Sequence, residues 1–178
     1  MSKIWRLVAN AVFFQLGWFA CVLSIRQPGL LLAACALLLV QLLWICDRGE
    51  WRAVLAVAAV GWLIDSIWLQ LGVLTIPNVH NLLPLWLAML WLLFATTLRH
   101  SLGWTARHWW LSSLLGALGG PLSYLSGATL AGLGVPWDAV SDLLLLSLSW
   151  ALLLPALHGL TRSRWLQAGN RVACGKTE

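Results

Sequence analysis

The chain has 178 residues, of which 61% are hydrophobic and 10% charged, and it carries fourteen tryptophans against one tyrosine. This composition excludes an ordinary soluble domain, which needs far more polar surface to stay in solution, and it predicts an integral membrane protein. The net charge of +5 is explained by basic residues that set membrane topology, so we expect no nucleic-acid partner.

Six apolar runs, separated by short polar breaks, follow one another along the chain. A hydrocarbon core of ~30 Å is crossed by about 20 mostly apolar residues in a helix. The runs cover residues 4–25, 29–46, 53–73, 82–98, 110–131 and 139–160. We therefore predict an all-α fold, a polytopic membrane helical bundle with six transmembrane helices, which forms a single integral membrane domain over residues 1–178.

Basic residues predict the orientation of this bundle, because Lys and Arg accumulate in short cytoplasmic segments. With six spans, ten of the eleven Lys and Arg residues fall on the side that carries both chain ends, including the basic tail at 161–178. Arg26 is the remaining one, on the other side. We expect both termini to be cytoplasmic.

The first two runs carry few polar side chains. Asn10 and Gln15 lie on different faces of the first helix, which predicts that this helix contacts several others. Both are candidates for interhelical hydrogen bonds or for ligand contacts. The second run offers Gln41 alone. The four cysteines show no C-x-x-C spacing, so they predict neither a disulfide framework nor a metal site.

The third run contains the stretch GWLIDSIWLQLG, with a single carboxylate at Asp65. Gly61, Asp65, Trp68 and Gly72 share one helix face, and the two glycines predict close packing of that face against another helix. A carboxylate at the bilayer centre costs roughly 2.5 to 3.5 kcal/mol. We therefore expect Asp65 in the interior, where it is paired, protonated or hydrated and serves either function or structural hydrogen bonding.

Small residues form a stripe in the fifth run, which predicts close approach of two helix backbones in lipid. The stripe consists of Gly116, Gly120, Ser123 and Gly127. Near the start of the sixth run, Asp142 is either a favourable charge at a helix N-terminus or a pocket residue. His80, in the loop at 75–84, is either a solvated residue or an acid/base or metal-binding group.

Depth along the spans places Asp65, Tyr124, Asp142 and the loop at 75–84 in the outer half of the membrane. We predict that they line a polar pocket open to the outside, with Asn10, Gln15 and His80 as further candidate residues. The expected function is binding or transport of a small or lipidic ligand, without a cofactor or metal. No pattern of a known catalytic site is present in the sequence, so we expect an enzyme less than a binding or transport protein.

Four segments in this order resemble an uncharacterised family of small bacterial inner-membrane proteins, a domain of unknown function: FFQLGWFACVL, GWLIDSIWLQLGVLTIPN, LPLWLAMLWLLFATTLRHSLGW and LLGALGGPLSYLSGA. The resemblance implies a multi-pass protein of the bacterial inner membrane. Genes for fatty-acyl modification near members of the family imply lipid-related work. The alternative to a binding protein is therefore a non-catalytic membrane partner of a lipid-modifying system. Membrane lipid is the expected partner, and a homo-oligomer or a complex with another membrane protein stays open.

Overall fold

The computed structural model describes residues 2–47, 49–76 and 83–163. His80 and most of the tail predicted at 161–178 therefore lie outside the described residues. The described part is all-helical and contains no strand. Its elements are α1 (Lys3–Leu23), α2 (Leu30–Val40), the π-helical turn η1 (Gln41–Ile45), α3 (Trp51–Gln70), α4 (Leu85–Thr97), the 3-10 turn η2 (Thr105–Arg107), α5 (Trp109–Ala131) and α6 (Val140–Arg162).

Three of the six helices, α1, α3 and α6, are long and apolar enough to cross a membrane. The apolar helix Leu30–Ile45, made of α2 and η1, and α4 are shorter. Helix α5 has 23 residues, but its glycines and serines lower its mean hydropathy. The predicted six helices are present, and three of them have the length and composition of membrane spans.

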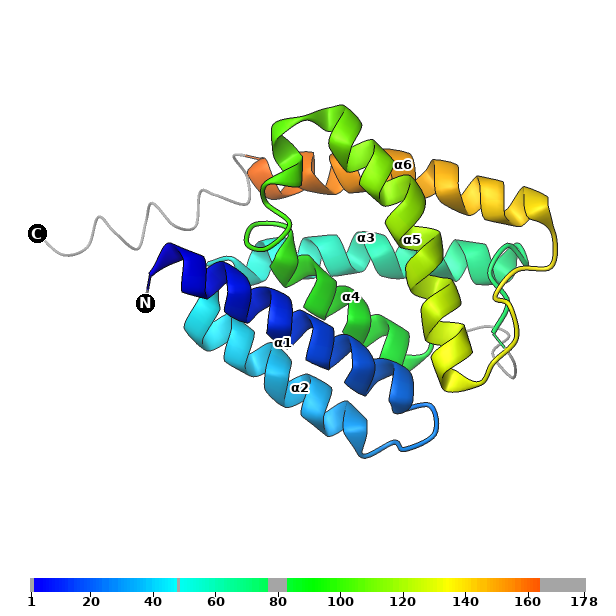
Figure 1. Ribbon diagram of the computed structural model, residues 1–178, viewed down its shortest axis with the longest axis horizontal. Helices are drawn as coiled ribbons and strands as arrows, with labels where there is room; N and C mark the ends of the chain where they lie inside the picture. The colour runs from blue at the N-terminus through cyan, green and yellow to red at the C-terminus, as the bar shows by residue number, and fades with distance from the viewer. Residues whose placement is uncertain (1, 48, 77–82, 164–178) are drawn as a thin grey trace, which may run out of the picture.

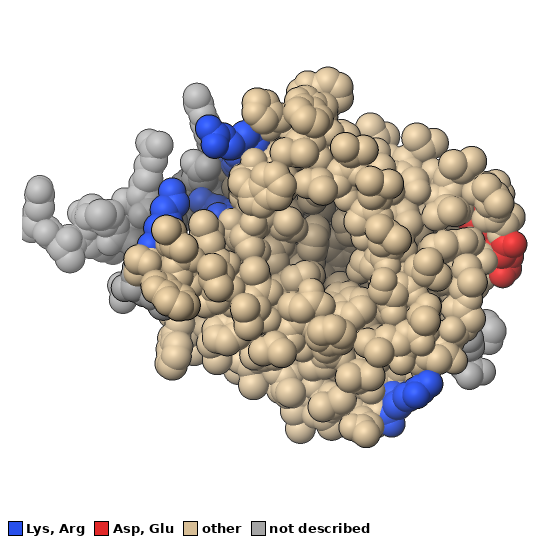
Figure 2. Space-filling view, in the orientation of Figure 1, with Lys and Arg blue, Asp and Glu red and all other residues tan. Residues whose placement is uncertain are grey.

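The six helices run alternately between two ends of the molecule (Figure 1). At one end Arg6 pairs with Asp47 at 2.9 Å, which joins the start of α1 to the end of η1. At the other end Arg26 Nε donates to the Ala131 carbonyl at 2.9 Å, which joins the end of α1 to the end of α5. Of the Lys and Arg side chains coloured on the face shown in Figure 2, most lie at the first of these ends.

Leucines cover much of the outer surface, as expected of helices that face lipid rather than water. Leu32 and Leu152 are exposed to 76% and 75% on helices from opposite sides of the bundle. The interior is instead filled around α4, where Leu87, Trp91 and Leu93 are almost completely buried. Helix α4 is therefore the central helix of the bundle, and the interior is built around its buried side chains.

Helices α5 and α6 approach each other closely along the glycine stripe. A Cβ atom at Gly116 would overlap the backbone carbonyl of Trp150, and one at Gly120 would overlap the Trp150 ring. At Gly127 a Cβ would make ordinary contact with Val22 of α1, at 3.4 Å. Glycine is thus required at the first two positions because no side chain fits between the helices.

The two glycines that flank Asp65 serve different purposes. Gly61 lies directly against the Trp91 ring, where any Cβ would overlap it. Gly72 follows the end of α3 with φ +72, and a Cβ there would have no atom within 4 Å. The predicted packing role is therefore wrong for Gly72, whose left-handed backbone at the helix end is the feature that favours glycine.

Candidate functional site

Asp65 lies completely buried on α3, between α4 and α5. Trp91 Nε1 donates to its Oδ2 atom at 2.6 Å, and the Tyr124 hydroxyl donates to Oδ1 at 2.5 Å. Each carboxylate oxygen thus has a donor from a different helix, which satisfies a group that is costly to bury without partners. The pair Asp65 and Tyr124, placed at similar depth by the sequence, is in direct contact.

A frame of aromatic rings holds the two donors in place. Trp91 stacks on Trp150 of α6 with ring centroids 5.4 Å apart and planes within 8°. Tyr124 meets the same Trp150 ring edge-on at 6.3 Å. Because Gly61 and Gly120 leave room for these two indoles, the glycine positions of α3 and α5 determine where the donors of Asp65 lie.

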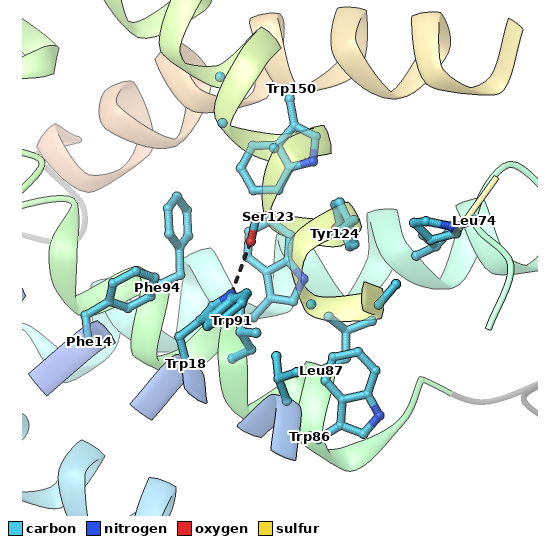
Figure 3. Close-up of a pocket in the computed structure, with 18 of the residues that line it drawn as sticks. Phe14, Trp18, Leu74, Trp86, Leu87, Trp91, Phe94, Ser123, Tyr124 and Trp150 are labelled. Atoms are coloured by element: carbon cyan, nitrogen blue, oxygen red, sulfur yellow. Dashed lines mark hydrogen bonds between the residues drawn. The ribbon is translucent and has the colours of Figure 1, made fainter. Parts of the chain in front are cut away.

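A cleft of about 340 Å³ lies on the side of this frame that faces α1 (Figure 3). It extends from Leu74 and Pro136 at one end of the bundle to Leu102 and Trp104 at the other. Between these ends, side chains of α1, α4, α5 and α6 line it. The molecular surface is hollowed near the centre of the face in Figure 2.

The lining of the cleft is almost entirely aromatic and aliphatic. Its polar groups between the two ends include Tyr124 and Ser123, whose Oγ atom accepts a hydrogen bond from Trp18 Nε1 at 3.2 Å. Asp65 does not line it, because Trp91 and Tyr124 stand in between. The sequence predicted a polar pocket, whereas the cleft is apolar because tryptophan, phenylalanine and leucine turn inward here.

Asn10 belongs to a separate buried network near the basic end. Its Nδ2 atom donates to Gln41 Oε1 at 2.5 Å, and its Oδ1 atom accepts from the Ser101 hydroxyl at 2.7 Å. The Thr96 hydroxyl donates to the same Gln41 oxygen at 2.8 Å. These bonds join α1, η1 and the turn after α4, so Asn10 acts as a link between helices rather than as a residue of the cleft.

The remaining candidates lie apart from Asp65. Gln15 is exposed on the outer side of α1, in a shallow groove against α5. Asp142 Oδ2 accepts from the Ala139 N–H at 3.0 Å, so this carboxylate caps the start of α6. Of the six candidate residues, the structure brings Asp65 and Tyr124 together, and His80 falls outside its described part.

A second cluster of titratable groups, which the sequence did not reveal, surrounds Glu50 at the basic end. The Glu50 Oε2 atom lies 2.9 Å from His100 Nε2 and accepts from the Asp47 N–H at 3.0 Å. Arg99 lies 3.4 Å from the other carboxylate oxygen. Burial raises the pKa of the Glu50 carboxyl, but these three partners outweigh it, so its pKa lies below the ordinary value. Glu50 is therefore ionised at neutral pH.

Comparison with known proteins identifies the family. Residues 7–156 match the family described as a protein of unknown function (DUF2878), and the chain belongs to that family. No curated protein and no solved structure matches the chain.

Proposed function

We propose that this protein binds a lipidic ligand in the cleft between α1 and α5, within a six-span bundle of the bacterial inner membrane. The proposal is based on the apolar cleft that lies beside the Asp65–Tyr124 pair. Its volume of about 340 Å³ falls in the range of roughly 300 to 1,000 Å³ typical of small-molecule sites. Binding in this cleft is the step that transport of such a ligand also requires.

A hydrocarbon chain is the chemistry that suits this lining. Phe14, Trp86 and Leu90 offer a long apolar wall without a charged group, and burying apolar surface contributes about 25 cal/mol per Å². The cleft extends towards both ends of the bundle, which favours an elongated ligand over a compact one. Because leucines surround the bundle, such a ligand can enter from the bilayer without crossing water.

Ser123 favours a polar group on this ligand. The Ser123 oxygen accepts from Trp18, and among the described residues its hydroxyl proton has no acceptor. The Tyr124 hydroxyl uses its proton on Asp65, and its oxygen accepts a hydrogen bond from Trp150, so Tyr124 is bonded within the protein. A carbonyl or hydroxyl of the lipid therefore finds a hydrogen-bond donor at Ser123.

The proposed topology has six spans with both termini in the cytoplasm. Its support is the alternation of the helices between two ends, together with the sequence, in which six spans assign ten of the eleven Lys and Arg residues to the side of both termini. Helix α4, with 13 residues, has a length of about 20 Å at 1.5 Å per residue. That is less than the ~30 Å hydrocarbon core, so the bilayer thins locally or protein surrounds the ends of α4.

Native mass spectrometry of purified protein tests the proposal with two matched leucine variants. Gly119 lines the cleft and a Cβ there meets no atom within 4 Å, so Gly119→Leu fills the cleft without displacing a helix. Gly159 on α6 is equally open but does not line the cleft, so Gly159→Leu is the control.

We expect the wild type and Gly159→Leu to retain one lipid per chain, and Gly119→Leu to retain at least about tenfold less, which corresponds to 1.4 kcal/mol. Thermal unfolding of both variants in detergent establishes that they are folded. Equal retention by the two variants, or no retained lipid in the wild type, contradicts the proposal.

A further inference from the structure

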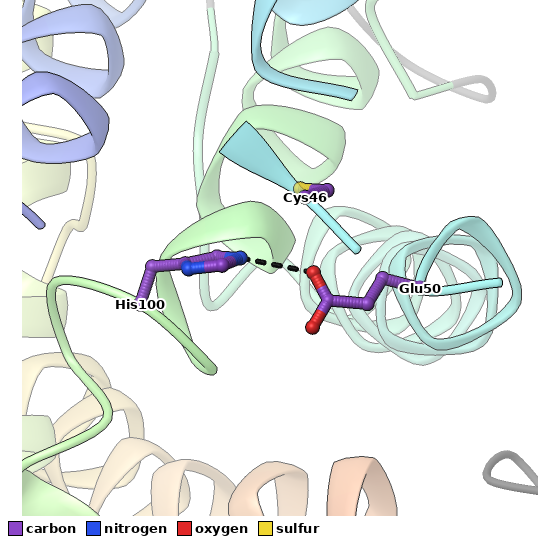
Figure 4. Close-up of side chains that lie close together, drawn as sticks. All are labelled: Cys46, Glu50 and His100. Atoms are coloured by element: carbon purple, nitrogen blue, oxygen red, sulfur yellow. Dashed lines mark hydrogen bonds and ion pairs between the residues drawn. The ribbon is translucent and has the colours of Figure 1, made fainter. Parts of the chain in front are cut away.

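Three side chains of different ligand types meet at the basic end of the bundle (Figure 4). Cys46 Sγ, a carboxylate oxygen of Glu50 and a ring nitrogen of His100 all lie within 4.8 Å of one another. Cys46 directly follows η1, Glu50 precedes α3, and His100 lies in the turn after α4. The cluster therefore joins the short connection between η1 and α3 to the turn after α4, which is about fifty residues further along the chain.

The fold fixes the positions of Glu50 and His100, whose side chains are mostly enclosed rather than free at the surface. The side chain of Glu50 is 5% exposed and that of His100 is 9% exposed. The Asp47 N–H fixes Glu50 Oε2, and the His100 backbone N–H bonds to the Thr97 carbonyl at 3.0 Å. The π-helical turn that ends at Ile45 aims the chain at this cluster, and such turns occur frequently at functional sites.

The separation of the three atoms suits a shared metal ion. In a tetrahedral zinc site the ligand atoms lie about 2.0 to 2.3 Å from the ion, hence about 3 to 4 Å from each other. Shifts of roughly 1 Å in Cys46 and His100 side chains bring the present arrangement to that geometry. Glu50 Oε1 keeps its ion pair with Arg99, while Oε2 faces His100.

The combination of ligands indicates which ion fits. Thiolate and imidazole ligands favour zinc over magnesium and calcium, which take oxygen ligands. One thiolate and one carboxylate neutralise the two positive charges of Zn²⁺. Binding displaces the thiol proton to water, and three protein ligands leave the fourth position for a water molecule.

The geometry points to a zinc site formed by Cys46, Glu50 and His100, which ties η1, α3 and the turn after α4 together. The site is independent of the lipid cleft, since none of its three residues lines it. Because metal ions serve as the probes of this site, its test does not require the lipid ligand of the cleft to be known.

Zinc titration calorimetry and cobalt absorption spectra of the tag-free full-length protein in detergent test this site. We expect one zinc per chain and a thiolate-to-cobalt charge-transfer band. Cys46→Ser should abolish the band and weaken zinc binding by more than about 100-fold, because loss of a ligand costs more than the 10- to 100-fold typical of its supporting partners. His100→Gln should weaken binding similarly.

Cys35→Ser and His108→Gln are the matched controls, because neither residue belongs to the cluster; both should bind zinc as the wild type does. Circular dichroism of metal-free Cys46→Ser, which keeps a hydroxyl beside Glu50, establishes that a loss of binding is not a loss of fold. Absence of stoichiometric zinc in the wild type, or unchanged binding and an unchanged cobalt band in Cys46→Ser, overturns the inference and leaves an ion-pair cluster.

Discussion

Asp65 shows how a single carboxylate is accommodated inside an apolar bundle. Its two oxygens accept from Trp91 and Tyr124, which come from two different helices. A buried donor that loses its acceptor costs about 1 to 3 kcal/mol. Asp65 therefore links α3, α4 and α5, and it also fixes the position of Tyr124, whose side chain lines the cleft.

Two substitutions of Asp65 distinguish this linking role from a role of its charge. Asp65→Leu leaves the donors of Trp91 and Tyr124 without an acceptor, so it should lower the free energy of unfolding by about 2 to 5 kcal/mol. Asp65→Asn keeps one acceptor for Trp91, and its amide can donate to the Tyr124 oxygen, so the loss should stay within about 1 kcal/mol.

Thermal or chemical unfolding in detergent, combined with lipid retention, gives the comparison. If Asp65→Asn keeps stability but loses lipid, the charge of Asp65 acts on the ligand. Equal stability of the leucine variant and the wild type would show that the two hydrogen bonds do not hold the helices.

At the scale of whole helices, the close contact between α5 and α6 depends on glycine at two positions of α5. Gly116 of α5 lies against the backbone of Trp150, which cannot rotate away as a side chain can. The indole of Trp150 then extends past Gly120 and stacks on Trp91. Close helix approach and the position of the donors of Asp65 are thus parts of one packing arrangement.

Alanine at two neighbouring glycines of α5 tests this arrangement. Gly116→Ala places a methyl group on the Trp150 carbonyl, and we expect it to lower the free energy of unfolding by about 1 to 3 kcal/mol, as overpacking does. Gly119→Ala meets open space and should be neutral or stabilising by up to about 1 kcal/mol, because alanine favours a helix over glycine. Melting temperatures that fall equally in both variants would refute a tight contact at Gly116.

The sequence predicts the helices well because each is a long and mostly apolar run. With α2 and η1 taken together as one helix, the observed ends lie within three residues of the expected ones. It also indicates the interior position of Asp65, since a carboxylate in lipid is costly. It does not indicate Trp91 as the partner, because the tryptophans of a membrane protein are expected mainly at its interfaces. The cluster of Cys46, Glu50 and His100 was missed because it forms between two turns whose proximity only the packing of α3 against α4 creates.

At the scale of the whole molecule, the two ends of the bundle differ in chemistry. The basic end contains the Glu50 cluster and the Asn10 network, which tie the helix ends together. Between the ends lies the apolar cleft, and leucines cover the outside. A basic end held by hydrogen bonds and ion pairs, next to an apolar middle, supports the proposal of a protein that is anchored at one membrane surface and binds a ligand within the bilayer.

Photoaffinity labelling with a diazirine fatty acid in membranes, followed by peptide mapping, tests the lipid cleft most directly. We expect labelling to concentrate on the cleft-lining segments 14–22 of α1 and 115–128 of α5. Unlabelled fatty acid in excess should suppress it, and so should Gly119→Leu. Labelling that instead spreads over outward residues such as Leu63 and Leu152, and that excess fatty acid does not reduce, would contradict a lipid-binding cleft.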